Sequence, residues 1–246
     1  MCDIDHRHGG RLRQITIGSR AILVDHADSP LDWGLYPMAP FAGRVRGAAL
    51  DFDGTVHRLE ANAAPHAIHG TVFDAEWSIE RADATSVVMN VGTGDGWPFA
   101  GRVTHTVTVS DTTVRCELTI RAHERMPVQL GWHPWFARPR SVRAGFAAML
   151  SKDVDGITTL ERVAPAPPPV DDCFIEPDHW PRVDFGDTVI EIASDCPYWV
   201  RYDAPGGHVC IEPQSGPPNG VNTVPRILEA GSSWSRWMEI RALTDQ

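Results

Sequence analysis

The sequence predicts an all-β protein, built as a large antiparallel β-sandwich, and three observations support this fold class. Hydrophobic and polar residues alternate with a period of two in many short segments, which is the pattern of strands that bury one face. The chain contains 21 glycines and 20 prolines, which break helices and mark many turns. No long amphipathic segment with helix caps lies between the strand-like segments, so a sandwich or barrel is favoured.

The clearest strand pair lies in the middle of the chain. Apolar residues and one histidine alternate with threonine from Val103 to Val109, and a second alternating segment runs from Val114 to Ile120. The link Ser110–Thr113 is short and polar, so we expect an antiparallel hairpin with Val107 and Leu118 buried. Further short strands are expected at Ile15–Val24, Trp77–Glu80, Ser86–Val91, Val189–Ala193, Trp199–Asp203, His208–Glu212 and Trp234–Arg241.

The length and composition favour one domain over residues 1–246. Hydrophobic residues make up 42% of the chain, which is enough for a substantial core. Val163–Val170 contains four prolines and is expected to be a stiff, extended loop. Because the strand pattern resumes after this segment without a change in composition, we interpret it as a loop within the domain and not as a linker.

Charge and hydropathy argue against several classes of function. The formal net charge of −10 repels phosphate backbones, so we expect no binding to nucleic acid. No apolar run approaches the length of a membrane-spanning helix, so no membrane association is expected. Met1–Arg13 is polar and lacks the apolar stretch of a secretory signal, which makes a cytoplasmic location the expectation. Lys152 is the only lysine, which argues against Schiff-base chemistry.

The cysteines suggest neither disulfides nor a zinc site. Their number is odd and no two of them form a C-x-x-C pair, so reduced and mostly buried thiols are expected. We accordingly predict no metal and no cofactor. The five residues are Cys2, Cys116, Cys173, Cys196 and Cys210.

Four segments depart from the strand pattern because they place polar residues among glycine, proline and tryptophan, as turns at strand ends do. In Tyr36–Gly47, two prolines and two glycines hold Arg44 in an apolar setting. An arginine fork suits sugar hydroxyls or a carboxylate, and a structural ion pair is the alternative. In the second segment, His66 and His69 have the spacing H-x-x-H, but no third metal ligand lies nearby in the sequence. On this feature alone, packed or surface histidines are favoured.

The other two segments contain a candidate acid and a candidate base. Gly131–Phe136 places His133 among aromatic residues that include Trp135. Aromatic faces stack on sugar rings, and histidine exchanges protons near neutral pH, although a core histidine is the alternative. In Val209–Asn219, Glu212 follows three apolar strand residues and precedes a turn rich in proline and glycine. A carboxylate there is costly to desolvate, so it needs a partner or a function.

Taken together and in this order, the segments resemble the motifs of the aldose 1-epimerase (galactose mutarotase-like) family. The resemblance extends from Leu35 to Asn222, which is most of the chain. The matching segments are Pro40–Val45, Ile68–Gly70, His133–Phe136, Asp171–Phe174 and Ile211–Pro213.

The resemblance implies a role for each matching residue and a large antiparallel β-sandwich as the fold. By this likeness Glu212 is the general base and His133 the general acid, while Arg44, His69 and Asp171 bind and orient the sugar. We add Trp135 as a residue that binds the sugar ring. Asp171 is chosen because it lies three residues before Phe174, with Asp172 as the alternative.

Two departures from the family pattern bear on which sugar is bound. Gly43 precedes Arg44 where family members often have asparagine. The chain is also shorter than many members, so peripheral strands or substrate loops are expected to be missing.

The expected activity is that of an aldose 1-epimerase that interconverts the α and β anomers of a free hexose. A carboxylate and an imidazolium suffice for this chemistry, since the hemiacetal opens and recloses by proton transfer alone. The alternatives are a hexose-6-phosphate 1-epimerase, which Arg44 and Arg46 would allow, and a non-catalytic carbohydrate-binding protein of the same fold. A glycoside hydrolase or lyase is less favoured in a short chain without an evident long cleft. The identity of the sugar and the oligomeric state stay open.

Overall fold

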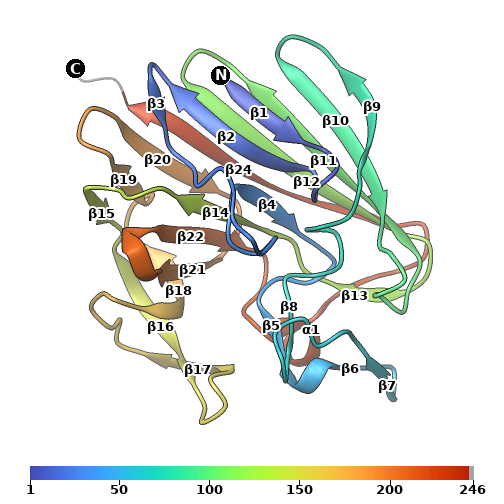
Figure 1. Ribbon diagram of the computed structural model, residues 1–246. Helices are drawn as coiled ribbons and strands as arrows, with labels where there is room; N and C mark the ends of the chain where they lie inside the picture. Colours follow the sequence, from blue (N-terminus) through green and yellow to red (C-terminus); the bar gives the residue numbers. More distant parts are fainter. Residues whose placement is uncertain (244–246) are drawn as a thin grey trace.

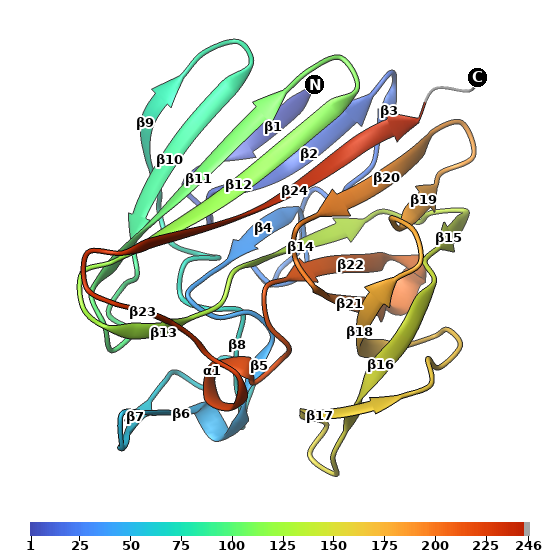
Figure 2. The same ribbon diagram turned by 180° about the vertical axis from the view of Figure 1, so that it is seen from behind.

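The computed structural model describes residues 1–243, and most of these residues lie in antiparallel strands. Two large sheets are layered against each other (Figure 1), and the view from behind shows the second sheet with its long strands in front (Figure 2). Side chains of both sheets form one buried cluster, with Leu35, Trp132 and Ile211 from the first sheet and Val107 and Leu118 from the second. The predicted antiparallel β-sandwich is therefore confirmed.

The first sheet has ten strands. They follow the order β1 (Cys2–Asp5), β2 (Arg11–Ile17), β4 (Leu35–Met38), β14 (Gly131–Phe136), β22 (Val209–Gln214), β21 (Tyr198–Asp203), β18 (Asp171–Pro177), β16 (Phe146–Lys152) and β17 (Thr158–Val163), and β3 (Arg20–Ala21) pairs with β2.

The second sheet has eight strands. They follow the order β15 (Ser141–Arg143), β19 (Arg182–Asp184), β20 (Val189–Ser194), β24 (Ser233–Leu243), β12 (Thr113–Ala122), β11 (Gly101–Val109), β10 (Ser86–Gly92) and β9 (Ser78–Ala82).

Small elements extend from the sandwich on one side. In Figure 1, β5, β8, α1 and the β6–β7 hairpin lie below one end of the sandwich, and β16 and β17, the last strands of the first sheet, reach down at the other end. No helix within residues 1–243 is both long and apolar enough to cross a bilayer. The small elements are the pairs β5 (Arg44–Val45) with β8 (Ala67–Ile68), β6 (Ala49–Phe52) with β7 (Thr55–Arg58) and β13 (Met126–Val128) with β23 (Arg226–Leu228), together with α1 (Gly220–Thr223) and the 3₁₀ turns η1 (Arg46–Ala48) and η2 (Pro205–Gly207).

The hairpin predicted in the middle of the chain is present. β11 and β12 pair from one end to the other, and both Val107 and Leu118 are buried. The strand predicted at Ile15–Val24 is interrupted, because Gly18 has a φ of 58° and forms a turn between β2 and β3. The proline-rich segment runs between β17 and β18, and both of these strands pair with β16. It is therefore a loop between strands of one sheet.

The strand predicted at His208–Glu212 is present as β22 but extends two residues further, to Gln214, and the segment Gly131–Phe136, which was not predicted as a strand, is β14. β14 lies between β4 and β22, and β22 lies between β14 and β21. Every residue of β14 and β22 is buried. Because both faces are covered, neither strand shows the alternation that marks a half-exposed strand, and Pro134 and Pro213 obscure the pattern further. Glu212 consequently lies inside its strand and not at the end of it.

Candidate active site

The register of the central strands brings the predicted acid and base together. β14 and β22 run antiparallel with Trp135 opposite Cys210, and two residues along the same register His133 lies opposite Glu212. On the other side of β14, His133 is the partner of Tyr36 in β4. Residues two apart on a strand share a face, so these side chains gather on one face of the first sheet.

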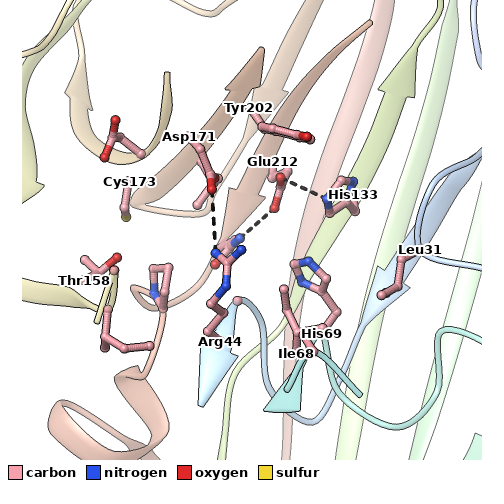
Figure 3. Close-up of a pocket in the computed structure, with 18 of the residues that line it drawn as sticks. Leu31, Arg44, Ile68, His69, His133, Thr158, Asp171, Cys173, Tyr202 and Glu212 are labelled. Atoms are coloured by element: carbon pink, nitrogen blue, oxygen red, sulfur yellow. Dashed lines mark hydrogen bonds and ion pairs between the residues drawn. The ribbon is translucent and has the colours of Figure 1, made fainter. Parts of the chain in front are cut away.

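A cavity of about 290 Å³ lies on this face, a size that suits one small molecule. Figure 3 shows that its walls come from the central strands, the β5–β8 pair and β17. All the site residues predicted from the sequence line it, namely Arg44, His69, His133, Trp135, Asp171 and Glu212. Asp172, the alternative to Asp171, also lines it. The lining further includes residues that were not predicted, among them Tyr36, Lys152, Thr158, Tyr202 and Gln214.

His133 and Glu212 interact directly. Nε2 of His133 lies 3.1 Å from Oε1 of Glu212, and their side chains are only 6% and 2% exposed (Figure 3). The other carboxyl oxygen, Oε2, accepts a hydrogen bond of 2.9 Å from Nε2 of Gln214, which is also buried. Both oxygens of Glu212 are thus held in place by nitrogen-bearing side chains.

Burial disfavours the charged form of both partners. It raises the pKa of Glu212 well above its usual value, and the nearby carboxylate of Asp171 raises it further, while the hydrogen bond from Gln214 and the charge of Arg44 lower it. Burial also lowers the pKa of His133 to about 3. A pair with a single proton has no net charge, so burial favours that state over the states with two protons or none.

The ring of His133 is fixed by aromatic contacts. It stacks on Tyr36 at 4.8 Å with an interplanar angle of 18°, and on Trp135 at 5.5 Å with an angle of 20°. Nδ1 of His133 is buried and has no hydrogen-bond partner within residues 1–243. The polar contact of the His133 ring is therefore made through Nε2, to Glu212. Trp135 is fixed in turn, because its Nε1 donates to the carbonyl oxygen of Leu31 at 2.7 Å.

Arg44 and His69 enter the cavity from the small sheet formed by β5 and β8. Arg44 is opposite Ile68 in this pair, and His69 follows at the end of β8. The φ of His69 is 61°, in the left-handed region, and Gly70 follows with a φ of 83°. A Cβ on Gly70 would lie 1.9 Å from the carbonyl oxygen of Ala39, so glycine is required there.

The glycine before Arg44 has a similar explanation. Gly43 has a φ of 69°, and a Cβ there would lie 2.9 Å from atoms of Pro218. A larger residue would be strained and would press on the turn after β22. The departure from the family pattern noted in the sequence thus suits the local packing of this chain.

His69 is buried and is held close to the acid–base pair. Its ring meets that of His133 edge to face at 4.9 Å. Burial lowers the pKa of His69 well below its usual value, and His133 and Arg44 lower it further. His69 is therefore neutral near pH 7, and a neutral imidazole can donate or accept a hydrogen bond.

The two histidines of the H-x-x-H segment have different positions in the structure. Nδ1 of His66 accepts a hydrogen bond of 3.0 Å from the backbone N–H of Gly47, so His66 supports the loop and does not line the cavity. His69 instead lies with His133 and Glu212, and ligand atoms of these three residues are within 4.8 Å of one another. Two histidines and a carboxylate at this spacing could hold a divalent ion. The sequence did not suggest this group, because its members come from distant segments.

The two aspartates at the start of β18 both reach the cavity. Oδ2 of Asp171 lies 3.7 Å from Arg44 and 3.9 Å from Nζ of Lys152. Oδ1 of Asp172 lies 3.1 Å from the same ammonium. Asp171 is therefore the carboxylate that connects to Arg44, and Asp172 pairs with Lys152.

Sequence reasoning missed several polar residues of the cavity, including Gln214, Tyr36 and Lys152. Gln214 lies two residues after Glu212 and shares its face of β22, so extending the predicted strand past Glu212 would have found it. Tyr36 was within a segment already singled out, but it was not given a role. The signal for Lys152 was that it is the only lysine in a chain rich in arginine.

Comparisons with known proteins agree with the fold. A family model described as aldose 1-epimerase matches residues 7–172, a range that includes Arg44, His69, His133 and Asp171 but ends before Glu212. Among curated proteins, YphB from Escherichia coli (strain K12), whose function is uncharacterised, is 26% identical over 108 residues. That match covers 43% of this chain and only 37% of YphB.

Solved structures with the same fold cover nearly the whole chain. A provisionally assigned aldose 1-epimerase from Escherichia coli K12 is 20% identical with a TM-score of 0.85, and the match covers 98% of this chain and 95% of that one. A GalM/aldose epimerase homologue from C. elegans is 15% identical with a TM-score of 0.82, covering 96% and 94%. Galactose 1-epimerase from Lactobacillus acidophilus NCFM is 13% identical with a TM-score of 0.80, covering 98% and 90%. Identities this low establish a shared fold.

Proposed function

Since the chain belongs to the aldose 1-epimerase family, we propose that it interconverts the α and β anomers of a free hexose. The observation that supports this most directly is the buried contact between Nε2 of His133 and Oε1 of Glu212. The two oxygens on the anomeric carbon of a sugar are close neighbours. A base and an acid that serve them must therefore also be close neighbours, as these two side chains are.

In the proposed reaction, Glu212 removes the proton from the C1 hydroxyl while His133 gives a proton from Nε2 to the ring oxygen. The C1–O5 bond breaks and an open-chain aldehyde forms. After rotation about C1–C2, the ring closes on the other face of the carbonyl, and both protons return. The pair begins and ends with one proton, so no other acid, base or covalent intermediate is needed.

The starting state needs the proton on His133. The hydrogen bond from Gln214 and the positive charge of Arg44 both lower the pKa of Glu212 and so favour its carboxylate form. A proton can move between the partners along the contact of 3.1 Å. We assign to Gln214 the task of keeping Glu212 ready to act as a base.

The remaining residues bind and orient the sugar in this proposal. The side chain of Arg44 is 39% exposed, and its guanidinium lies 3.7 Å from Asp171, beyond hydrogen-bond distance, so its donors are available to a ligand. Asp171 and neutral His69 offer further hydrogen bonds to hydroxyl groups. Trp135 lines the cavity beside His133 and can pack against an apolar face of the ring. Fixing the sugar in this way supplies much of the acceleration.

A hexose-6-phosphate 1-epimerase is supported less well by the geometry. Arg46, one of the two arginines that would allow a phosphate site, does not line the cavity. Its guanidinium is paired with Asp153 and, at 2.7 Å, with Asp155. A non-catalytic carbohydrate-binding protein is the other alternative, and the retained His133–Glu212 pair favours catalysis over it.

Anomerisation should be measured by polarimetry or NMR with a panel of free and phosphorylated aldoses. We expect at least one neutral hexose to be interconverted faster than the spontaneous rate, with a Glu212→Gln variant close to that rate. Preference for glucose 6-phosphate over every neutral hexose would favour the first alternative. Sugar binding without any acceleration would favour the second.

A further inference from the structure

The cavity has a second polar region away from the acid–base pair. In Figure 3, Thr158 lies on the far side of Arg44 and Asp171 from His133. This region is built by the end of β16, the start of β17 and the start of β18, and Lys152 and Asp172 line it. None of these side chains is used in the ring opening described above.

Each charged side chain in this region lies close to a side chain of opposite charge. Nζ of Lys152 lies 3.1 Å from Asp172 and 3.9 Å from Asp171, which also faces Arg44. Two cations and two carboxylates therefore alternate along one side of the cavity. Lys152 and Asp172 are only 27% and 19% exposed, so their pair is better shielded from water than a typical surface ion pair.

The turn after Lys152 is tied to the opposite wall of the cavity. Arg46, two residues after Arg44, pairs with Asp153 and Asp155 of this turn. The backbone N–H groups of Asp155 and Ile157 donate to Asp153 at 3.0 Å each. Lys152 is thus held at the cavity by the strand before it and by a turn that is anchored after it.

We propose that Lys152 and Asp172 together bind a hydroxyl group of the sugar remote from C1 and thereby select the substrate. This inference rests on the proposed sugar-binding function. A hydroxyl group both donates and accepts, an ammonium only donates, and a carboxylate only accepts. A hydroxyl can therefore satisfy both partners at once when it inserts between them.

The same reasoning disfavours charged substituents at that position. A phosphate or carboxylate group would accept from Lys152 but would face Asp172 and Asp171 as a like charge. An amino group would suit the aspartates but would repel Lys152. The matched pair thus selects a neutral, hydroxylated substrate, and this selection is separate from the proton transfers at C1.

Steady-state anomerisation of D-glucose, D-galactose and their 4-deoxy and 6-deoxy analogues tests the proposal. Lys152→Met and Asp172→Asn should raise KM by about 10- to 100-fold, the range for a hydrogen bond to a charged group, with little change in kcat. The increase should vanish for the one analogue that lacks the bound hydroxyl. Arg162→Met is a matched control, because it breaks an ion pair between β17 and β18, the two strands that flank β16, outside the cavity.

Chemical modification gives a second readout that does not require turnover. Because Lys152 is the only lysine, trinitrobenzenesulfonate labels one side chain besides the terminal amine, and peptide mapping separates the two. We expect the neutral hexoses to protect Lys152, and the analogue without the bound hydroxyl to protect it much less. Melting curves confirm folding, and Asp172→Asn alone tests the KM prediction if Lys152→Met does not fold.

The outcomes separate this inference from the proposed function. Equal KM penalties for all analogues, or a penalty confined to kcat, would overturn the inference while the epimerase activity stood. Protection of Lys152 by hexoses without anomerisation would support the inference and contradict the proposed enzyme. The inference is wrong if no sugar protects Lys152. The sugar concentration is raised until the activity is saturated or, if there is no activity, up to the solubility limit of the sugar.

Discussion

Nε2 of His133 and Oε1 of Glu212 lie 3.1 Å apart, although the two residues are 79 positions apart in the sequence. Both side chains are almost completely buried, so the pair is shielded from water until a ligand enters. A buried acid–base contact of this kind makes each partner sensitive to the loss of the other.

Glu212→Gln and His133→Gln should each lower kcat by about two to four orders of magnitude, as the loss of a general acid or base commonly does. At position 212, glutamine keeps the shape of the glutamate. At position 133, it places an amide near the position of Nε2 of the histidine. In neither variant can the amide exchange the proton. Stopped-flow polarimetry or NMR measures the rate. Glu176→Gln, which alters an exposed ion pair, is the control and should retain full activity. Near-normal turnover in either site variant would remove that residue from the mechanism.

The pH profile of kcat should be bell-shaped and broad. Burial lowers the pKa of His133 to about 3, so a second proton joins the pair only at strongly acid pH. Burial raises the pKa of Glu212 well above its usual value, so the last proton leaves only at a pH well above the usual range of a carboxyl group. Activity should therefore change little around neutral pH. The pKa values of the acid and alkaline limbs describe the coupled pair and not either residue alone. An acid limb centred at the ordinary histidine value of about 6.5 would contradict this.

Gln214→Met should lower activity and move the whole bell to higher pH. The hydrogen bond from Gln214 lowers the pKa of Glu212, so its loss makes Glu212 hold a proton more tightly. The carboxylate form becomes rarer, and kcat should fall about tenfold or more, as expected for one hydrogen bond to a charged group. Gln129→Met removes another buried amide, outside the cavity, and should reduce stability without shifting the bell. An unshifted profile for Gln214→Met would show that Gln214 does not tune the pair.

His105 should make the protein less stable in acid. Its Nδ1 donates to the carbonyl oxygen of Gly10 at 3.0 Å, and burial lowers its pKa to about 4. Between that value and about 6.5 the unfolded chain binds a proton that the folded protein does not, so stability falls as the pH falls through this window. The loss amounts to roughly 3 kcal/mol at most.

Denaturant unfolding at several pH values measures this effect. His105→Asn keeps a donor near Nδ1 but does not titrate, so its free energy of unfolding should depend less on pH than that of the unchanged protein. His69 and His133 are present in both proteins, and their contributions cancel in the difference. Parallel curves for the two proteins would exclude His105 as a source of acid sensitivity.

Activity should survive exhaustive chelation, even though His69, His133 and Glu212 are close enough to share a divalent ion. An ion would take the place of the proton between His133 and Glu212, and the proposed ring opening needs that proton. Anomerisation rates before and after treatment with EDTA, with the metal content measured in parallel, test this. Loss of activity that a single divalent ion restores would require a metal-based mechanism.

Much of the fold class was accessible from local sequence patterns. The alternation across β11 and β12 predicts a hairpin with Val107 and Leu118 inside, because one face of that pair packs on the core and the other faces solvent. Apolar and polar residues alternate along a strand only when one face of the strand is buried and the other is exposed. The alternation is therefore absent at β14, whose residues are all buried.

The sequence by itself also determined which candidate residues to look for, since Arg44, His69, His133, Asp171 and Glu212 stand in recognisable motifs and all of them line the cavity. Only the tertiary structure decided how they meet. The antiparallel register of β14 and β22 sets His133 opposite Glu212, and β16 and β18 bring Lys152 to Asp172. Strand pairing of this kind joins segments that are distant along the chain. Local periodicity and motif spacing describe each segment separately, so they cannot specify which segments become neighbours.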